Sequence, residues 1–232
     1  MSHQNSFDPI MVDNIEYPIE HLKGLQLILT VIFGNKDSRD IEINVRPTNH
    51  LYSRAVVNED HSNKESLVNS GHWLVSYEHS LGNYQNVKNP QKVKENRIFC
   101  TSKWEQSHLL PTFINLIKQN PKEITVLAND GDTKTCMSAI LNIEDQPDEI
   151  YVVFFILTKV NSKELNMLIE SGYCLRKDDN RKAPRILSKN KHVDRKPFIV
   201  VVKNVMEGRL PFENQQQNKR RGKQKQKKQK QK

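Results

Sequence analysis

The feature that most constrains the fold of this chain is a succession of short segments rich in β-branched residues and separated by turn residues. Residues 25–33 are rich in Leu, Ile and Val, and residues 40–46 alternate between apolar and polar side chains, which is the period of a strand with one buried face. Between them, the Gly-Asn-Lys-Asp sequence at 34–37 is typical of a turn. These segments therefore predict a β-hairpin with one face in solvent.

A single segment has the pattern of a helix. Ser102 and Glu105 have the spacing of a capping box, and the apolar residues between 109 and 117 recur with a helical period. Pro111 lies inside this segment. Because proline has no backbone N–H and crowds the preceding turn, we expect it to kink or restart the helix. Either way, one helix is expected to pack on a sheet.

Further strand patterns flank this helix. Strands are expected at 97–100, 124–128, 136–143, 151–159 and 197–203. Residues 165–173 fit both a helix and a strand, and we favour a strand because the preceding Asn-Ser dipeptide is typical of a hairpin turn. This order of elements predicts an α+β fold with a mainly antiparallel sheet and one main helix.

The chain divides into three parts by composition. Residues 1–22 lack a steady period and predict a loosely ordered N-terminal arm. Residues 23–213 carry the strand and helix patterns of a single domain, within which the polar residues 58–96 predict a long surface excursion. Residues 214–232 are rich in Lys and Gln, hold no apolar side chain and are expected to be a disordered tail.

Positive charge is concentrated at the C-terminal end. The net charge is +9, and nine of the 36 Lys and Arg residues lie within 219–232, where there is no acidic residue. The remaining 27 basic residues equal the 27 acidic ones. Residues 176–196 hold nine basic and three acidic side chains, so residues 1–175 are net acidic. The chain is an acidic body with a basic end.

This distribution predicts a cytoplasmic accessory protein that binds RNA or DNA without reading its sequence, because cations on an unfolded segment neutralise phosphates but cannot read base edges. The residues expected to contact phosphates are Arg176, Lys177, Arg181, Lys182, Arg185, Lys189, Lys191, Lys219, Arg220, Arg221, Lys223, Lys225, Lys227, Lys228, Lys230 and Lys232. Three alternatives remain open: a solvating tail without a specific role, an anionic membrane surface, and a protein-interaction module whose acidic body meets a basic partner.

The densest group of reactive side chains is Pro-Thr-Asn-His-Leu-Tyr-Ser-Arg at 47–54. If this segment is extended, His50, Tyr52 and Arg54 project to one face. A metal-independent ribonuclease needs a base for the 2′-hydroxyl, an acid for the leaving oxygen and a cation on the phosphate, and these three residue types can fill those roles. The alternative interpretation is a polar strand face with Tyr52 packed at its rim.

With the helix and the closing strands, residues 49–54 resemble the N-H-x-Y-[ST]-R segment of a group of uncharacterised bacterial proteins of the sort found near mobile elements. The function of that group is unknown, so the resemblance implies no activity. The order of elements over 102–174 is also similar to that of compact ribonuclease toxins of the RelE and colicin-nuclease kind. That likeness implies that a ribonuclease active site would draw on these side chains: Lys134, Lys159, Tyr173 and Arg176.

No metal or cofactor is expected. The candidate ligands are spaced by 11, 11 and 7 residues, without the i, i+4 pair or neighbouring Cys of zinc sites: His50, His61, His72 and His79.

The cysteines and the apolar runs indicate the cytoplasm. Cys100, Cys136 and Cys174 are an odd number of widely spaced thiols, which fits a reducing compartment and not a disulfide framework. The first twenty residues lack a secretory pattern, and the longest apolar run, 151–157, is far shorter than the roughly 20 residues of a membrane span.

Overall fold

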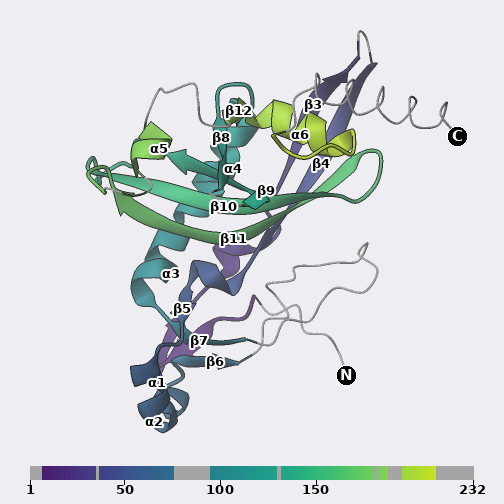
Figure 1. Ribbon diagram of the computed structural model, residues 1–232. Helices are drawn as coiled ribbons and strands as arrows, with labels where there is room; N and C mark the ends of the chain where they lie inside the picture. Colours follow the sequence, from purple (N-terminus) through teal and green to yellow (C-terminus); the bar gives the residue numbers. More distant parts are fainter. Residues whose placement is uncertain are drawn as a thin grey trace, which may run out of the picture.

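The centre of the fold is a seven-stranded sheet that carries helices on both faces (Figure 1). The computed structural model describes residues 7–34, 37–75, 95–129, 132–179, 181, 183–187 and 195–212. In sheet order the strands are β12 (Arg195–Pro197), β8 (Thr125–Asn129), β9 (Asp132–Ile140), β10 (Glu149–Lys159), β11 (Glu164–Arg176), β4 (Asp37–Pro47) and β3 (Gln26–Phe33). All neighbours are antiparallel except β11 and β4, which are parallel. The α+β fold with a mainly antiparallel sheet is confirmed.

The hairpin predicted from the first two apolar segments is present as β3 and β4. Its strands pair in an unbroken register from Gln26↔Asn44 to Phe33↔Asp37. Leu27, Leu29 and Val31 are at most 3 % exposed, whereas the residues between them face solvent. The sequence therefore predicted the hairpin from its turn and apolar segments, and the alternation over 40–46 predicted the buried face of β4 with Ile41, Ile43 and Val45.

Residues 165–173 form a strand, as favoured, within β11. The long hairpin of β10 and β11 has one bulge between Phe154 and Phe155. β11 then pairs in parallel with β4, from Glu164↔Glu42 to Ile169↔Pro47. This pairing joins the N-terminal hairpin to the later strands of the sheet.

The predicted helix is two helices, α3 (Thr101–Ser107) and α4 (Leu109–Gln119). Pro111 lies in the first turn of α4, where its missing N–H is tolerated, so of the two expected outcomes, a kink or a restart, the structure shows the restart. Ser102 does not cap the helix, because α3 already begins at Thr101 after Cys100. Leu110, Phe113, Ile114 and Ile117 are buried against one face of the sheet.

The final buried strand predicted at 197–203 is wrong. The residues after Pro197 form helix α6 (Phe198–Met206), which packs on the same face of the sheet as α4. Phe198, Val201 and Val202 are fully buried, and this three-to-four spacing is helical. A run of β-branched residues favours a strand locally, but burial against the sheet outweighs that small preference.

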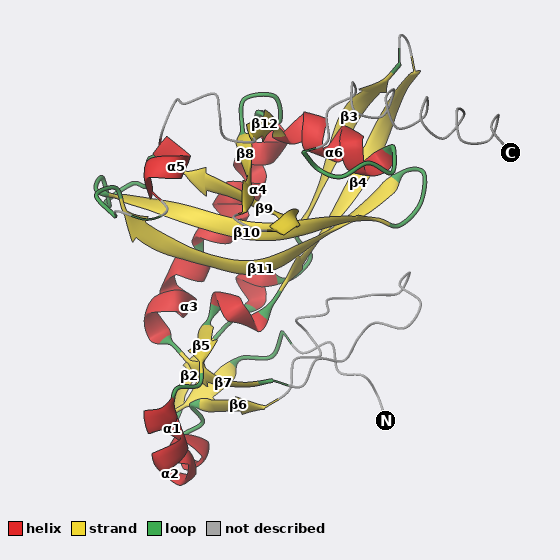
Figure 2. Ribbon diagram, in the orientation of Figure 1, coloured by secondary structure: helices red, strands yellow, loops and turns green. Residues whose placement is uncertain are grey.

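A second, three-stranded sheet lies below the first, as the lower part of Figure 2 shows. Its strands, in order, are β5 (Ser53–Ala55), β7 (Asn96–Phe99) and β6 (Trp73–Val75). The short helices α1 (Asn58–Ser62) and α2 (Lys64–Asn69) lie between β5 and β6 in sequence. Within the surface excursion predicted at 58–96, most of residues 58–70 lie at the surface as expected, but 58–75 form ordered elements, and residues 76–94 lie outside the described residues.

The N-terminal segment is docked, contrary to the loosely ordered arm predicted for 1–22. Residues 1–6 lie outside the described residues, but β1 (Ile10–Val12), β2 (Ile15–Tyr17) and the 3-10 turn η1 (Glu20–Leu22) follow. Ile19 and Leu22 are each 1 % exposed, and the Trp104 indole N–H donates to the Pro18 carbonyl oxygen at 2.8 Å. Tertiary contacts that have no local pattern order this segment.

The basic residues 176–196 contain a short helix, α5 (Ala183–Leu187), as well as β12. Ala183 and Ile186 are buried on the sheet face opposite α4, against Leu127 and Val152. Residues 188–194 and 213–232 lie outside the described residues, and with them the prediction of a disordered tail. Among the described helices none combines the length and apolarity needed to cross a bilayer.

A matched pair of substitutions tests the helical assignment of α6. Val201 is fully buried and Val200 only partly so, whereas a strand starting at Phe198 would bury Val200 and expose Val201. We expect Val201→Ala to lower the free energy of unfolding by about 2 kcal/mol and Val200→Ala by less than about 1 kcal/mol. Urea denaturation of both variants is the measurement, and a larger loss at Val200 would contradict the helix.

Candidate functional site

The segment with the reactive side chains folds as a helical turn. β4 ends at Pro47, and Asn49–Leu51 form the 3-10 helix η2 before β5 begins. The Ser53 hydroxyl donates to the Asn49 carbonyl oxygen at 2.6 Å and holds this turn closed. Strand alternation does not apply through a helical turn, so the expectation that His50, Tyr52 and Arg54 share one face is wrong.

Two of these three side chains support the fold. Tyr52 is 1 % exposed and belongs to the core, where the sequence predicted a place at the rim or in a site. Arg54 donates two hydrogen bonds to Asp60, at 2.6 and 2.7 Å, and Asp60 also accepts from the Val57 N–H at 2.8 Å. These bonds lower the pKa of Asp60 to about 2, and they attach α1 to β5. His50 is partly exposed like Arg54, but it makes no such contact within the segment 47–60.

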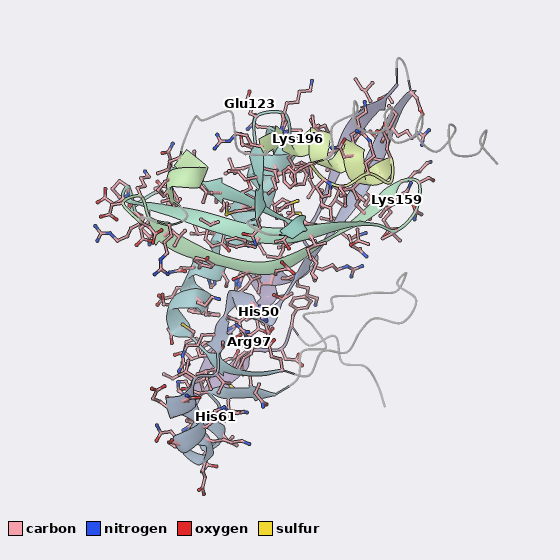
Figure 3. All side chains as sticks on the ribbon, viewed as in Figure 1. His50, His61, Arg97, Glu123, Lys159 and Lys196 are labelled. Carbon is pink, nitrogen blue, oxygen red and sulfur yellow. The ribbon has the colours of Figure 1, made fainter. Side chains whose placement is uncertain are left out.

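His50 pairs with a carboxylate that the sequence did not single out. Its Nε2 atom lies 3.0 Å from Glu95 Oε2, and the other oxygen of Glu95 accepts from Arg97 Nη1 at 2.8 Å. The buried Arg97 also donates from Nε to the Ser53 hydroxyl at 2.7 Å. Figure 3 shows His50 and Arg97 between the two sheets. We call His50, Glu95, Arg97 and Lys103 the His50 cluster.

The protonation states of this cluster follow from burial and hydrogen bonding. Burial lowers the pKa of His50, and it outweighs the bond to Glu95, which would raise it. Burial would raise the pKa of Glu95, but the hydrogen bonds from His50 and Arg97 outweigh it and lower the pKa. At neutral pH a neutral imidazole therefore faces a carboxylate. Because a carboxylate only accepts, Nε2 carries the proton, and Nδ1, which has no hydrogen bond to a described residue, keeps its lone pair.

Lys103 adds a cation from α3. Burial, and then the nearby charge of Arg97, lower the pKa of Lys103 to about 8. Its Nζ atom lies 5.9 Å from the centroid of the Tyr173 ring on β11. Within the described part of the chain it has no hydrogen bond and no carboxylate partner. A partly desolvated ammonium group of this kind is suited to an anion.

Tertiary structure assembles the His50 cluster from two stretches of the chain, η2 and residues 95–103, which include β7 and the start of α3. The parallel pairing of β4 with β11 places η2 against β11, and α3 packs on both. Sequence reasoning missed Glu95, Arg97 and Lys103. Arg97 offered one indication. It lies two residues before the apolar Phe99 in a predicted strand, and side chains two residues apart in a strand lie on the same face, which here is the buried one. Lys103 and Glu95 lie in segments with no pattern that marks them.

A comparison with known proteins gives a family. The model of the YjaZ family matches residues 9–206, from the first hairpin to the end of α6. The chain belongs to the YjaZ family. No curated protein and no solved structure gives a significant match. The matched region includes the whole His50 cluster, while the resemblance to mobile-element proteins is not addressed by it and stays a prediction.

The residues chosen by likeness to ribonuclease toxins do not converge in this YjaZ-family fold. Lys159 donates to the Met206 carbonyl oxygen at 2.6 Å, at the C-terminal end of α6. Lys159 pairs with Leu165 at one end of the β10–β11 ladder and Arg176 with Glu149 at the other, about 33 Å away by strand geometry. Tyr173 alone lies beside the His50 cluster, and the Lys134 side chain lies outside the described ones.

Of the described members of the predicted phosphate-binding set, Arg176 and Lys177 have local partners for their side chains, and Arg181 has one for its backbone N–H. Arg176 pairs with Asp178, and both side chains are 70 % exposed. Lys177 donates to the Pro147 carbonyl oxygen at 2.5 Å, and the backbone N–H of Arg181 donates to Asp179. These members lie outside the described residues or side chains: Lys182, Arg185, Lys189, Lys191 and all nine cations of 219–232.

The other histidines of the sequence analysis have separate surroundings. His61 lies edge-on to the Trp73 ring, and His72 lies 2.9 Å from the Ser70 hydroxyl. His79 is outside the described residues, and among those that are described no group of three His, Cys, Asp or Glu side chains could hold a metal ion.

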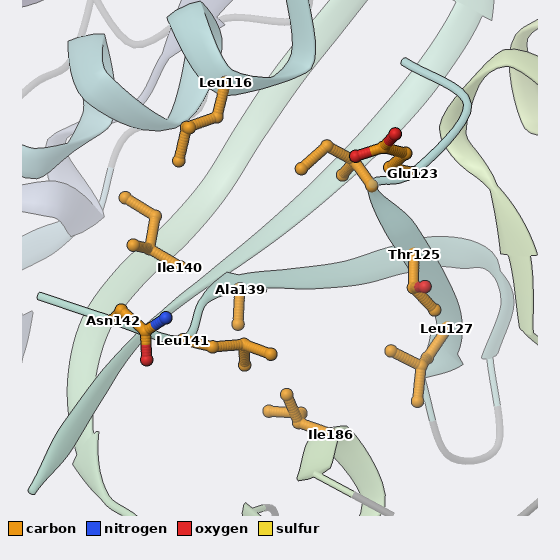
Figure 4. Close-up of a pocket in the computed structure, with 10 residues that line it drawn as sticks. Leu116, Glu123, Thr125, Leu127, Ala139, Ile140, Leu141, Asn142 and Ile186 are labelled. Carbon is orange, nitrogen blue, oxygen red and sulfur yellow. The ribbon is translucent and has the colours of Figure 1, made fainter. Parts of the chain in front are cut away.

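A separate cavity of about 300 Å³ lies between α4, α5 and the β8–β9 ladder (Figure 4). Its walls are mainly aliphatic, with Leu116, Ile140 and Ile186 on three sides, and Glu123 is the only ionisable residue among its described lining. Its described lining offers the Glu123 carboxylate but no cation and no second ionisable group beside it, so the His50 cluster is the better candidate for chemistry.

The pH dependence of stability tests the environment of Lys103. Its pKa of about 8 is below the ordinary 10.5, so burial of the ammonium destabilises the fold below about pH 8, and this penalty disappears as the pH rises toward 10.5. We expect Lys103→Met to raise the melting temperature at pH 7 by about 2 to 4 °C, allowing for solvent screening of a partly exposed group. The gain should vanish near pH 10.5.

The matched control is Lys118→Met on α4, an exposed lysine of the same domain. It should leave the melting temperature nearly unchanged at both pH values. If Lys103→Met is less stable than wild type at pH 7, the interactions of the ammonium group in the folded protein outweigh the cost of burying it, which contradicts the prediction.

Proposed function

We propose that this protein binds nucleic acid through its phosphates, without reading sequence, and that Lys103 provides a contact in the folded domain. The observation that carries the proposal is the partly buried ammonium group with no carboxylate partner among the described residues. The neighbouring Arg97 is matched by Glu95, so Lys103 represents a local surplus of positive charge. A phosphodiester supplies the oxygen acceptors that this group lacks.

The C-terminal segment 219–232 supports the same partner class. Nine cations without an acid or an aromatic residue can neutralise phosphates, but they lack the stacking surface that distinguishes bases. The described cysteines are free thiols, which fits a protein of the cytoplasm, where nucleic acid is accessible.

Salt titrations of binding test this proposal. Each phosphate contact contributes about −0.7 to −0.9 to the slope of log affinity against log salt. For full-length protein on a single-stranded RNA we expect a slope of roughly −6 to −8, which falls to roughly −2 to −4 when residues 219–232 are deleted. Lys103→Ala should reduce the magnitude of the slope by about one, because one phosphate contact is lost.

Lys118→Ala is the matched control and should bind as the wild type does. Two unrelated RNAs and one DNA duplex of equal length should bind about equally. If the slope is unchanged after deletion of 219–232, the tail does not contact the nucleic acid. If it is unchanged in Lys103→Ala, Lys103 does not contact a phosphate. Binding to anionic vesicles but not to RNA would favour the membrane alternative.

A second candidate function, metal-independent RNA cleavage, is favoured by the His50–Glu95 pair. Glu95 orients a neutral imidazole whose Nδ1 atom can accept the proton of a 2′-hydroxyl. The 2′-oxygen then bonds to phosphorus as the bond from phosphorus to the 5′-oxygen breaks, and that oxygen takes a proton from Lys103. The products are a 2′,3′-cyclic phosphate and a free 5′-hydroxyl.

Cleavage is tested with purified protein and chelator on RNAs of varied sequence. His50→Ala should lower the rate by about 10² to 10⁴, the usual contribution of a general base. His61→Ala, which changes a histidine on α1 outside the cluster (Figure 3), should retain activity. If the wild type binds RNA but does not cleave it, the ribonuclease function is refuted and nucleic-acid binding remains.

A further inference from the structure

The exposed edge of the large sheet is formed by β3, which pairs only with β4 among the described strands. The Val45 N–H donates to the Leu25 carbonyl oxygen at 3.0 Å, which continues the β3–β4 register by one pair. Backbone groups alternate in direction along an antiparallel strand. Those of Gln26, Ile28, Thr30 and Ile32 therefore point away from β4, and no described residue pairs with them.

Among its described residues, this edge lacks four features by which proteins commonly prevent strand addition. Sheet edges are commonly protected by charged side chains, proline, a bulge or a very short strand. β3 is eight residues long, its sequence QLILTVIF contains neither a charge nor a proline, and its register with β4 is unbroken. On its solvent face, Ile28 and Ile32 are 57 % and 58 % exposed.

We propose that β3 is the interface through which two copies of this chain form a continuous sheet across a two-fold axis at Thr30. In that register Thr30 faces its own copy, and Ile28 faces Ile32 of the second copy on both sides of the axis. Each of these pairs exchanges two backbone hydrogen bonds, because all their polar groups already point outward. The exposed isoleucines cover one another across the new pair.

Symmetry and charge favour a second copy over an unrelated strand. Two-fold pairing of this strand brings apolar residues opposite one another on both faces, with Leu29 opposite Val31 on the buried side and Ile28 opposite Ile32 on the other. The nearest acidic side chains, Asp40 and Glu42, lie on β4. The two β4 strands would be three strand spacings apart, about 14 Å, which exceeds the screening length of about 8 Å at physiological salt.

Cysteine cross-linking of the full-length protein tests the register. In the proposed pair the two Cα atoms at position 30 lie about 5.5 Å apart, within the range of a disulfide. Thr30→Cys should form a disulfide-linked dimer on mild oxidation. Gln26→Cys is the matched control on the same face, because its two copies would be offset by eight residues, about 27 Å. It should cross-link no more than wild type, whose native cysteines set the background.

The mass in solution provides the second measurement. Light scattering after gel filtration should give the mass of a dimer for wild type and of a monomer for Ile28→Lys, with unchanged circular dichroism. Ile15→Lys, which charges an equally exposed isoleucine on β2, should remain dimeric. A monomeric wild type with no cross-link above background in Thr30→Cys would overturn the proposal, as would equal cross-linking of Gln26→Cys.

Discussion

The parallel pairing of β4 with β11 is the contact on which the rest of the structure depends. It is the only parallel pair among the described strands, and it joins segments about 120 residues apart, as the buried hydrogen bond from Arg46 to Asn166 shows. Without it the N-terminal hairpin and the later strands would be separate sheets with exposed apolar edges. Because β4 runs directly into η2, the same pairing also determines where His50 lies.

The buried Arg97 has a comparable role at the smaller scale of the site. A guanidinium group removed from water requires hydrogen-bond partners, and Arg97 obtains them from Glu95 and Ser53. Glu95 is thereby held in place to receive the imidazole N–H of His50. One buried cation thus links β5, β7 and η2 and leaves Lys103 as the charge without a partner in the described structure.

The two proposed interaction surfaces lie on different parts of the fold. The His50 cluster lies where η2, β7 and α3 meet β11, whereas β3 forms an edge of the large sheet, with β4 between it and β11. Pairing through β3 would leave the cluster open to solvent in both copies. A dimer would then present two sets of basic C-terminal segments, and linked sites of this kind bind a long polyanion more tightly than one site alone.

The sequence by itself determined those elements whose side-chain pattern reflects the burial of one face. The alternation in β4, the apolar face of α4 and an interruption of the helix near Pro111 were readable from the sequence, because burial of one face imposes a period of 2 or 3.6 on the side chains and proline interrupts a helix. The sequence also showed the charge of 219–232, which does not depend on a fold. Only the tertiary structure decided that 198–206 is a helix, that the N-terminal segment is docked and that Glu95, Arg97 and Lys103 gather around His50. These outcomes depend on contacts between residues far apart in the chain, and such contacts leave no period in the sequence.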